Sequence, residues 1–302
     1  MKFFLNLFIL LFISKVSMAQ TDLIPSPIPD IKSKTPSKSK ESYKDIIQKA
    51  QSLTLQQDRL QASQVLVRVI KSETYNRKAQ EELKKTLNNI STLFYTEKTQ
   101  KFYEYAKSLL RESPAEAAEK FKEAIKVEPD NILILLWMAR LAMVTGKCEE
   151  ANTSITKALE INPFYPQLQL TDLQIKACLQ VIEPLNKSAS EYKYLETLYP
   201  LYFNMVLVQK FFTQKQYPEA TYHIEKAKQI DKEFPEIYFW ESQILEKQEL
   251  SFKDAASRYI RGCKTITKAD YLKYELEPRL CHEFKTFEVE YKGILDQEKK
   301  DN

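Results

Sequence analysis

Glycine and histidine are scarce in this sequence of 302 residues, which contains 3 glycines and 2 histidines. Glycine-rich phosphate loops and glycine-dependent hairpins need glycine wherever the backbone adopts a positive φ, so both are nearly excluded. Cys281 and His282 are adjacent, but no second Cys/His pair accompanies them at zinc spacing. His223 falls in a predicted helix, where we expect a surface position. The sequence therefore predicts no metal site and no cofactor.

The residue arrangements of an enzyme are also missing. Carboxylate pairs such as Glu149 and Glu150 stand at predicted helix starts, where negative charge favours the helix dipole. No nucleophile stands beside a base at a recognisable spacing. We therefore predict that the chain is not an enzyme and has no catalytic residue.

Charge of one sign does not dominate. The chain has 45 Lys and Arg against 41 Asp and Glu, a formal charge of +4. A nearly neutral chain has no general attraction to nucleic acid or anionic membranes. We expect protein partners and no nucleic acid.

Residues 1–19 have the pattern of a signal peptide. Lys2 precedes an apolar run, Phe3–Ile13, and Ser17–Ala19 forms a small-x-small cleavage site, so Gln20 should begin the mature chain. The alternative is a membrane anchor, but the run is shorter than the ~20 residues that span a bilayer. We expect export to a bacterial periplasm or envelope, with secretion as the alternative, and no membrane span in the mature chain.

Residues 20–41 contain four prolines among serine and lysine. Few bulky side chains are available for burial there. This composition predicts a disordered or extended tether. The alternative is an ordinary leader before the first helix.

A helical period of apolar residues begins at Ser42, and its best-matched stretch is Ile132–Pro163. Two predicted helices flank a turn at Thr145–Lys147. In the second helix, Ala151, Ile155 and Ala158 share one face, and Pro163 then ends the unit.

This helix pair recurs at a fixed spacing. Ala117 and Ala151 are 34 residues apart, Ala220 follows after 69, and Ala255 after a further 35. The small residue, the bulky residue four positions later and the closing proline resemble the second half of a tetratricopeptide repeat. The resemblance implies an all-α fold, an α-solenoid of stacked antiparallel helix pairs forming a right-handed superhelix.

The repeat register divides the rest of the chain. Residues 42–95 form a divergent N-terminal repeat plus an extra helix, and residues 97–265 form the repeats. The unit at 164–199 is degenerate, because Pro184 and Ser188 interrupt its second helix. Residues 266–297 are expected to cap the array, with Pro278 in the first turn of a terminal helix. Its apolar stripe is Leu280, Phe284, Phe287, Tyr291 and Ile294.

In the family, the first helices of successive repeats line a concave groove. The inward positions that the resemblance implies here are Tyr103, Lys107, Leu136, Arg140, Met143, Tyr202, Met205, Gln209, Phe212, Trp240, Ile244 and Lys247. Aromatic, Met and Arg side chains are typical interface anchors. The positive charges of Lys107, Arg140 and Lys247 would favour an acidic segment or a C-terminal carboxylate on the partner. Alternatively, many of these residues pack against the neighbouring helix.

Four cysteines occur, and an exported protein can hold them as disulfides. Cys148 starts a second helix and Cys178 ends the following first helix, so in a stack of antiparallel pairs these ends are neighbours. Cys263 and Cys281 are similarly placed near the end. We predict Cys148–Cys178 and Cys263–Cys281, with four free thiols as the alternative.

Taken together, the patterns predict a non-enzymatic scaffold that binds a peptide or helix of a protein partner in its groove, in the periplasm or cell envelope. One alternative is a structural spacer that oligomerises through its outer surface and ends. Another is an accessory to an envelope polysaccharide or secretion machine.

Overall fold

The structure is a computed structural model that describes residues 41–110 and 112–291. These residues belong to one compact unit, Glu41–Asn302. The predicted signal peptide, residues 20–40 of the predicted tether, and Ile294 lie outside the described residues. Within them the chain forms helices and no strand, so the predicted all-α solenoid is confirmed. None of the described helices is both long and apolar enough to cross a bilayer.

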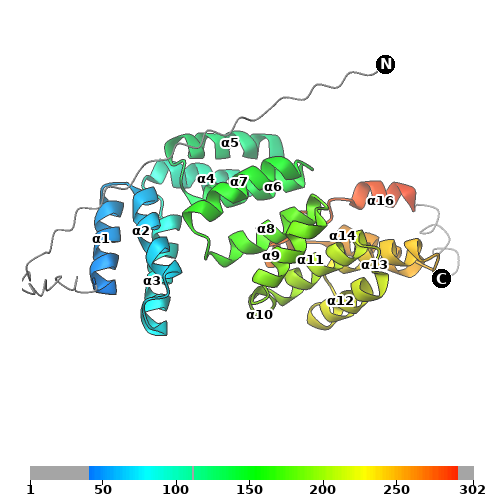
Figure 1. The fold of residues 1–302 in the computed structure, drawn as a ribbon. Coiled ribbons are helices and arrows are strands. Elements are labelled where there is room, and N and C mark those ends of the chain that lie inside the picture. Colours follow the sequence, from blue (N-terminus) through cyan, green and yellow to red (C-terminus); the bar gives the residue numbers. More distant parts are fainter. Residues whose placement is uncertain (1–40, 111, 292–302) are drawn as a thin grey trace, which may run out of the picture. The chain divides into compact units, whose positions relative to one another are not determined.

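The helices follow one another with short connections (Figure 1). Their bounds are α1 Tyr43–Leu55, α2 Arg59–Lys71, α3 Arg77–Thr92, α4 Glu97–Leu109, α5 Pro114–Val127, α6 Ile132–Val144, α7 Cys148–Ile161, α8 Pro166–Cys178, α9 Ile182–Glu191, α10 Leu195–Leu198, α11 Pro200–Thr213, α12 Tyr217–Ile230, α13 Pro235–Lys247, α14 Lys253–Thr265, α15 Lys268–Lys273 and α16 Phe284–Glu290.

Local sequence explains where most of these helices begin. Ser42, Asp58, Asn76 and Thr96 cap α1 to α4, and each side chain accepts a hydrogen bond from a backbone N–H of the first turn. Later helices begin differently. A proline occupies the first turn of α5, α8, α11, α12 and α13, where the missing N–H removes no helical bond.

Pairs of consecutive helices make the most extensive contacts, above all α4–α5, α6–α7, α11–α12 and α13–α14. The repeated small residues are buried at these crossings. Ala117, Ala151 and Ala220 are 0% exposed and Ala255 is 4% exposed. The bulky residues four positions later, such as Phe121, are buried as well. These residues therefore belong to the core of the helix pairs.

The turns within the pairs show the same period as the alanines. A residue with positive φ occurs at Gly146, Gln180, Lys215 and Glu249, at intervals of 34, 35 and 34. In each turn the next N–H bonds to a carbonyl five residues earlier, as from Lys147 to Ala142 at 2.8 Å. This geometry closes a helix C-terminus. It places Gln180, and therefore the degenerate unit, in the common register.

The degenerate unit is more regular than the sequence predicted. Pro184 and Ser188 do not interrupt its second helix, because both lie within α9. Pro184 is the third residue of α9, a first-turn position where proline is tolerated. The departure lies in the length of the second helix: α9 has 10 residues, and the short α10 follows it.

The N-terminal helices are joined to the repeats by a buried arginine. Arg59 of α2 is 0% exposed and pairs with Glu128 at 2.7 Å and Asp130 at 2.6 Å, beyond the end of α5. Its Nε donates to the carbonyl of Ile90 at 3.2 Å, near the end of α3. The extra helix α3 therefore covers the beginning of the repeat array through satisfied polar contacts as well as apolar packing.

The terminal helix differs from the prediction. Pro278 does not begin it, and α16 starts only at Phe284. Leu280 therefore leaves the expected stripe and packs with α8 and α11, whereas Phe287 and Tyr291 pack on α14. The ring centroids of Tyr259 and Phe287 are 5.2 Å apart. The described part of the predicted capping region, residues 266–291, thus contains two short helices, α15 and α16, with a non-helical stretch between them.

The packing at Ala151 leads to a prediction about stability. Ala151→Leu should lower the midpoint of thermal unfolding, because the larger side chain must push α6 and α7 apart at a cost of about 1–3 kcal/mol. Circular dichroism melts measure the change. Ala115→Leu is the matched control, since Ala115 is exposed on α5. Equal midpoints for both variants would contradict the close crossing.

Candidate partner-binding face

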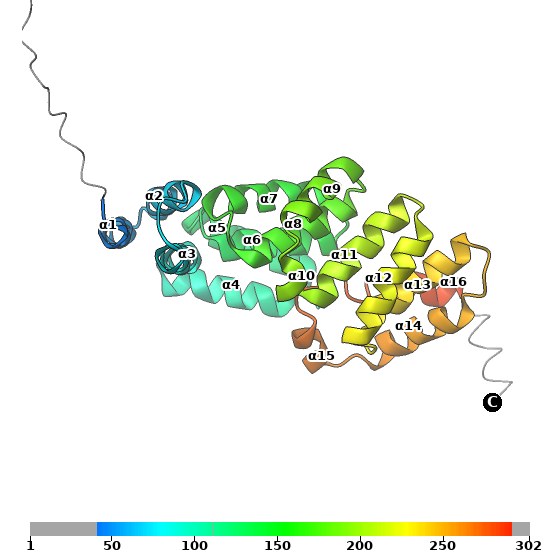
Figure 2. The same ribbon diagram turned by 60° about the horizontal axis from the view of Figure 1, so that its bottom comes forward.

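The first helices bring together residues that are distant in the sequence. Lys107 of α4, Arg140 of α6, Gln174 of α8, Tyr202 of α11 and Glu236 of α13 all lie next to one stretch, Lys273–Cys281. We call these five residues the first-helix face, and the stretch the C-terminal segment. In Figure 2 the chain passes through α15 near α10 and α11 before it returns to α16 beside α14. The face predicted to bind a partner is therefore covered by the chain itself.

The first-helix face holds the backbone of the C-terminal segment. The amide of Gln174 donates to the carbonyl of Leu276 at 2.8 Å, and the hydroxyl of Tyr202 donates to the carbonyl of Lys273 at 3.3 Å. The N–H of Cys281 donates to Oε1 of Glu236 at 2.6 Å. Lys273 ends α15, and the residues after it form turns, such as the one closed by the Glu277 N–H on the carbonyl of Tyr274 at 2.9 Å. The first-helix face thus holds a turned chain through its backbone.

Side chains of the segment fill the space between the helices. Tyr274 is 3% exposed, its ring centroid lies 4.9 Å from that of Phe234, and its hydroxyl donates to Asp231 at 2.9 Å. Glu275 pairs with Lys107 at 3.2 Å, and the Lys107 ammonium also lies 4.6 Å from the Trp137 ring centroid. An aromatic residue and an acidic residue of the segment are thus recognised separately.

Arg140 is the least satisfied member of the face. It is 1% exposed, and Nε and Nη1 have no hydrogen-bond partner among the described residues. Its Nη2 lies 3.5 Å from Gln167 Oε1, and the guanidinium stands 4.8 Å from the Trp137 ring centroid. Burial lowers the pKa of Arg140, while the charge of Glu275 opposes that shift. A buried guanidinium without a paired carboxylate is unfavourable.

Two buried carboxyl groups lie at the other end of the segment. Burial and the nearby charge of Glu277 raise the pKa of Glu236 to about 8. Burial likewise raises the pKa of Glu277, although the Arg279 N–H donates to its Oε1 at 3.2 Å and favours ionisation. Neither Glu236 nor Glu277 is paired with a full positive charge. The buried arrangement therefore favours the protonated form of both carboxyl groups.

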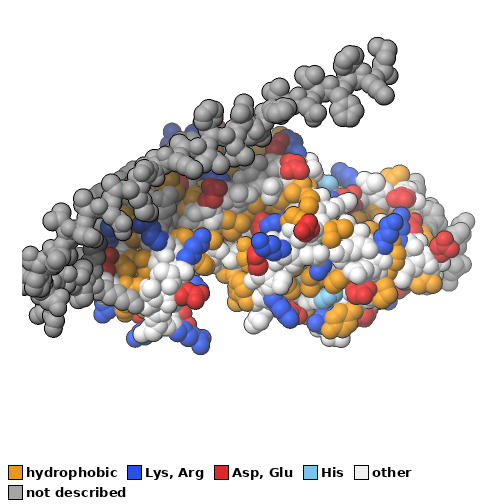
Figure 3. Space-filling view, in the orientation of Figure 1, with side chains coloured by type: hydrophobic (Ala, Val, Ile, Leu, Met, Phe, Trp, Pro, Cys, Tyr) orange, Lys and Arg blue, Asp and Glu red, His pale blue; other side chains and the backbone are white. Residues whose placement is uncertain are grey.

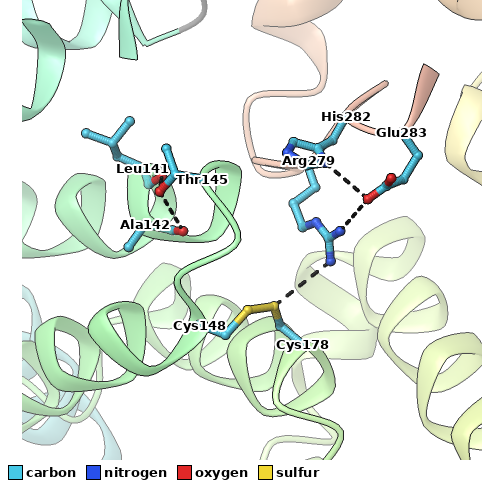
Figure 4. The surroundings of a disulfide bond; sticks show 8 residues. All are labelled: Leu141, Ala142, Thr145, Cys148, Cys178, Arg279, His282 and Glu283. Carbon is cyan, nitrogen blue, oxygen red and sulfur yellow. Dashed lines mark hydrogen bonds and ion pairs between the residues drawn. A yellow bond between two sulfur atoms is a disulfide. The ribbon is translucent and has the colours of Figure 1, made fainter. Parts of the chain in front are cut away.

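Both disulfides predicted from the sequence are present in the structure. Cys148–Cys178 has a Cα–Cα distance of 6.1 Å, and Cys263–Cys281 one of 5.6 Å. Figure 4 shows Arg279 directed at the first disulfide, where its Nη1 lies 4.0 Å from Cys178 Sγ, while Nη2 contacts Glu283 at 2.8 Å. The second disulfide joins the segment to α14.

A carboxylate oxygen of Glu236 and the sulfurs of Cys263 and Cys281 lie within 4.8 Å of one another. The two sulfurs are bonded to each other, so they are not thiolate ligands in this form. The group acts here as an attachment point for the C-terminal segment.

The residues predicted for the groove divide into three groups. Lys107, Arg140 and Tyr202 meet or adjoin the C-terminal segment. Leu136, Met143, Met205 and Ile244 are at most 2% exposed and pack in the core. Tyr103, Gln209, Phe212 and Trp240 are half-buried, and Lys247 is exposed. The Phe212 and Trp240 rings pack edge to face at 5.3 Å, so packing explains much of the predicted set.

Sequence reasoning missed the segment and the helix residues that hold it, namely Trp137, Gln174, Glu236, Tyr274, Glu275 and Glu277. One signal was present. The predicted pairing of Cys263 with Cys281 already brings the stretch between them back to the end of α14, which limits where its apolar and acidic residues can lie.

His223 is not at the surface position that the sequence predicted. It is half-buried in a cavity of about 330 Å³ between α9, α11 and α12. Its ring stacks on Phe211 at 5.4 Å, and Nδ1 lies 2.8 Å from Asn204 Oδ1. Burial and the charge of Lys226 lower the pKa of His223 to about 4, so the ring is neutral at pH 7. Packing and one hydrogen bond account for it.

A known family matches the centre of the chain. The family described as tetratricopeptide repeat matches residues 108–173, which include α5, α6, α7 and most of α8. Residues 108–173 are therefore tetratricopeptide repeats. None of the curated proteins matches it.

Several solved structures are similar to this chain. A tetratricopeptide repeat protein from Parabacteroides merdae is 15% identical, covers 78% of this chain and 97% of its own, with a TM-score of 0.48. MamA from Desulfovibrio magneticus RS-1 is 16% identical and covers 57% of this chain and 96% of its own, with a TM-score of 0.43. Yeast Tom70 is 15% identical and covers 80% of this chain and 47% of its own, with a TM-score of 0.40.

Glu236, the buried acid of the first-helix face, predicts that the stability of the chain depends on pH. The pKa of Glu236 is raised to about 8, so this group contributes stability below its ordinary pKa and loses that contribution as the pH rises through about 8. Glu236→Gln keeps an oxygen for the Cys281 N–H and does not titrate. Relative to the unchanged chain, its unfolding midpoint should therefore rise between pH 5 and pH 8.5.

Thermal melts at pH 5, 7 and 8.5 measure this difference. Glu160→Gln is the control for the loss of one negative charge, because Glu160 is exposed on α7. A difference between the Glu236→Gln variant and the unchanged chain that stays constant over this pH range would contradict a protonated Glu236.

Proposed function

We propose that this chain is a non-enzymatic scaffold that holds a peptide segment of a protein partner on its first-helix face. The observation that carries the proposal is the seating of Lys273–Cys281 on that face. Gln174, Tyr202 and Glu236 bind the backbone of the segment rather than side chains peculiar to it. Such contacts suit a partner segment whose backbone adopts similar turns.

The charges of the face favour an acidic partner segment or a C-terminal carboxylate. Lys107 already accommodates Glu275, and Arg140 is buried without a paired carboxylate. Trp137 lies against both cations and supplies an aromatic wall. Figure 3 shows acidic and basic side chains interspersed over the side in view, without a large area of one charge. Selectivity in this proposal therefore comes from the face and not from a general surface charge.

The proposed location is the periplasm or cell envelope, with secretion as the alternative. The signal-peptide pattern of residues 1–19 supports export. The two disulfides give independent support, because disulfides persist mainly in oxidising compartments. The spacer alternative has less support, since Phe287 and Tyr291 of its proposed contact surface are buried on α14.

The proposal is tested by photocrosslinking capture with the mature chain. Lys107→Glu should reduce capture of the specific partner at least about tenfold, because one charge-assisted contact is worth roughly 1.5–3 kcal/mol. The Lys107 side chain is 36% exposed, so the reversal does not bury a new charge. Quantitative mass spectrometry of the crosslinked species gives the measurement.

Lys247→Glu is the matched control, because Lys247 is exposed at the end of α13, away from the segment. Its capture should remain unchanged. Equal capture by both variants, or no species captured above a sample without the crosslinker, would count against a partner on this face.

A further inference from the structure

We infer that the C-terminal segment is a tethered competitor that a peptide segment of a protein partner displaces, and that a partner carboxylate on Arg140 favours the exchange. The inference rests on the proposed function. It adds the chemistry that selects the partner and the contact within the chain that opposes binding.

The first step concerns which contacts can be exchanged. Gln174 and Tyr202 donate to the segment's carbonyl groups, and Glu236 accepts from its Cys281 N–H. A partner segment that adopts similar turns offers the same backbone groups, so it can replace these bonds one for one. The exchange then depends on the side chains.

The second step concerns the side chains, where the resident segment is an imperfect ligand. Glu275 binds Lys107, and Glu277 accepts a hydrogen bond from the N–H of Arg279. Neither carboxylate bonds to Arg140, whose Nε and Nη1 have no partner in the described chain. A partner segment that places a carboxylate on these two donors gains a bidentate, charge-assisted pair that the resident segment lacks. The first-helix face therefore favours a ligand other than its own segment.

The third step concerns attachment. Cys263 at the end of α14 and Cys281 at the end of the segment are 18 residues apart and joined by the disulfide. A displaced segment remains on this short loop, so it competes at a high effective concentration, on the order of millimolar for a short flexible connection. Only molecules whose first-helix face is free can bind a partner. The apparent Kd of the partner therefore equals the intrinsic Kd divided by the fraction of molecules with a free face.

The opposing view is a permanent cap. Tyr274 and Leu280 are 3% and 4% exposed, as expected for residues that complete a core. The two views differ in two measurable respects. A cap does not exchange with an added peptide, and Arg140 beneath a cap has no role in binding.

The first experiment uses the mature full chain and a fluorescein-labelled peptide with the sequence of residues 270–283, in which serine replaces Cys281. A variant with Tyr274→Ala and Glu275→Gln weakens the resident segment. The peptide should bind this variant at least about tenfold more tightly than the unchanged chain in fluorescence anisotropy, because the competitor is weakened. A peptide with Glu275 and Glu277 changed to glutamine should bind at least about tenfold more weakly than the parent peptide.

Two outcomes overturn the inference. One is the absence of saturable peptide binding to the weakened variant while its thermal melt shows a folded chain. The other is equal binding of the parent peptide and the glutamine-substituted peptide.

The second experiment separates a binding role of Arg140 from a structural one. On the weakened variant, Arg140→Met should leave the unfolding midpoint unchanged or higher, because an apolar side chain replaces a buried charge that lacks a carboxylate. The binding test for Arg140 uses peptides of residues 270–283 in which one residue at a time is replaced by aspartate. At least one of them should bind the weakened variant at least about tenfold more tightly than the parent peptide, because it places a carboxylate on Arg140, and Arg140→Met should remove that gain. Arg68→Met is the control, because Arg68 is exposed on α2, and its binding should be unchanged.

A lower midpoint with unchanged binding would assign Arg140 to the core and overturn the inference. The peptide measurement does not use the natural partner, so its failure is distinct from a failure of the proposed function. A partner that is captured through Lys107 but is not released by the acidic peptide would leave the scaffold function standing and overturn the exchange.

Discussion

The close crossing of the helices in each pair is the constraint on which the other features of the described chain depend. Ala117, Ala151 and Ala220 are fully buried where two helices approach. Their recurrence makes successive pairs stack alike, so that first helix follows first helix along one side. Gly262 extends the constraint to the last pair, because a Cβ there would stand 3.2 Å from Cγ of Pro235. A larger residue at such positions would separate the helices and disperse the first-helix face.

Stacking in this way concentrates polar side chains on the first helices. Arg140 and Glu236 come from different helix pairs, and both are buried once the C-terminal segment is seated. Removing charged groups from water is costly unless partners replace the lost hydration. The segment supplies some of these partners, including the Cys281 N–H for Glu236. It supplies none for Nε and Nη1 of Arg140, so the described chain keeps an unfavourable buried cation on the face that the segment covers.

The parts of this structure that repeat could be predicted from the sequence, whereas the parts that depend on a single long-range contact could not. The spacing of the alanines gave the helix pairs, and the pair order gave both disulfides. The stripe from Leu280 predicted a helix, yet Cys281 has a φ of +57° and bonds to Glu236, because tertiary contacts outweigh a periodicity of a few residues. Arg140 was expected on an open face. The segment that covers it lies more than one hundred residues later in the chain, and no local sequence pattern signals that contact.

The Cys263–Cys281 disulfide has two opposite effects on this face. It fixes one end of the C-terminal segment beside Glu236, so that little chain entropy is lost when the segment returns to its seat. The same bond keeps the displaced segment next to any ligand that takes its place. A tethered competitor of this kind discriminates by free energy, because a weak ligand loses to the segment and a ligand that satisfies Arg140 does not. The two features of the first-helix face therefore complement each other. The seated segment excludes peptides that bind weakly, and the unpaired Arg140 favours a ligand that carries a carboxylate.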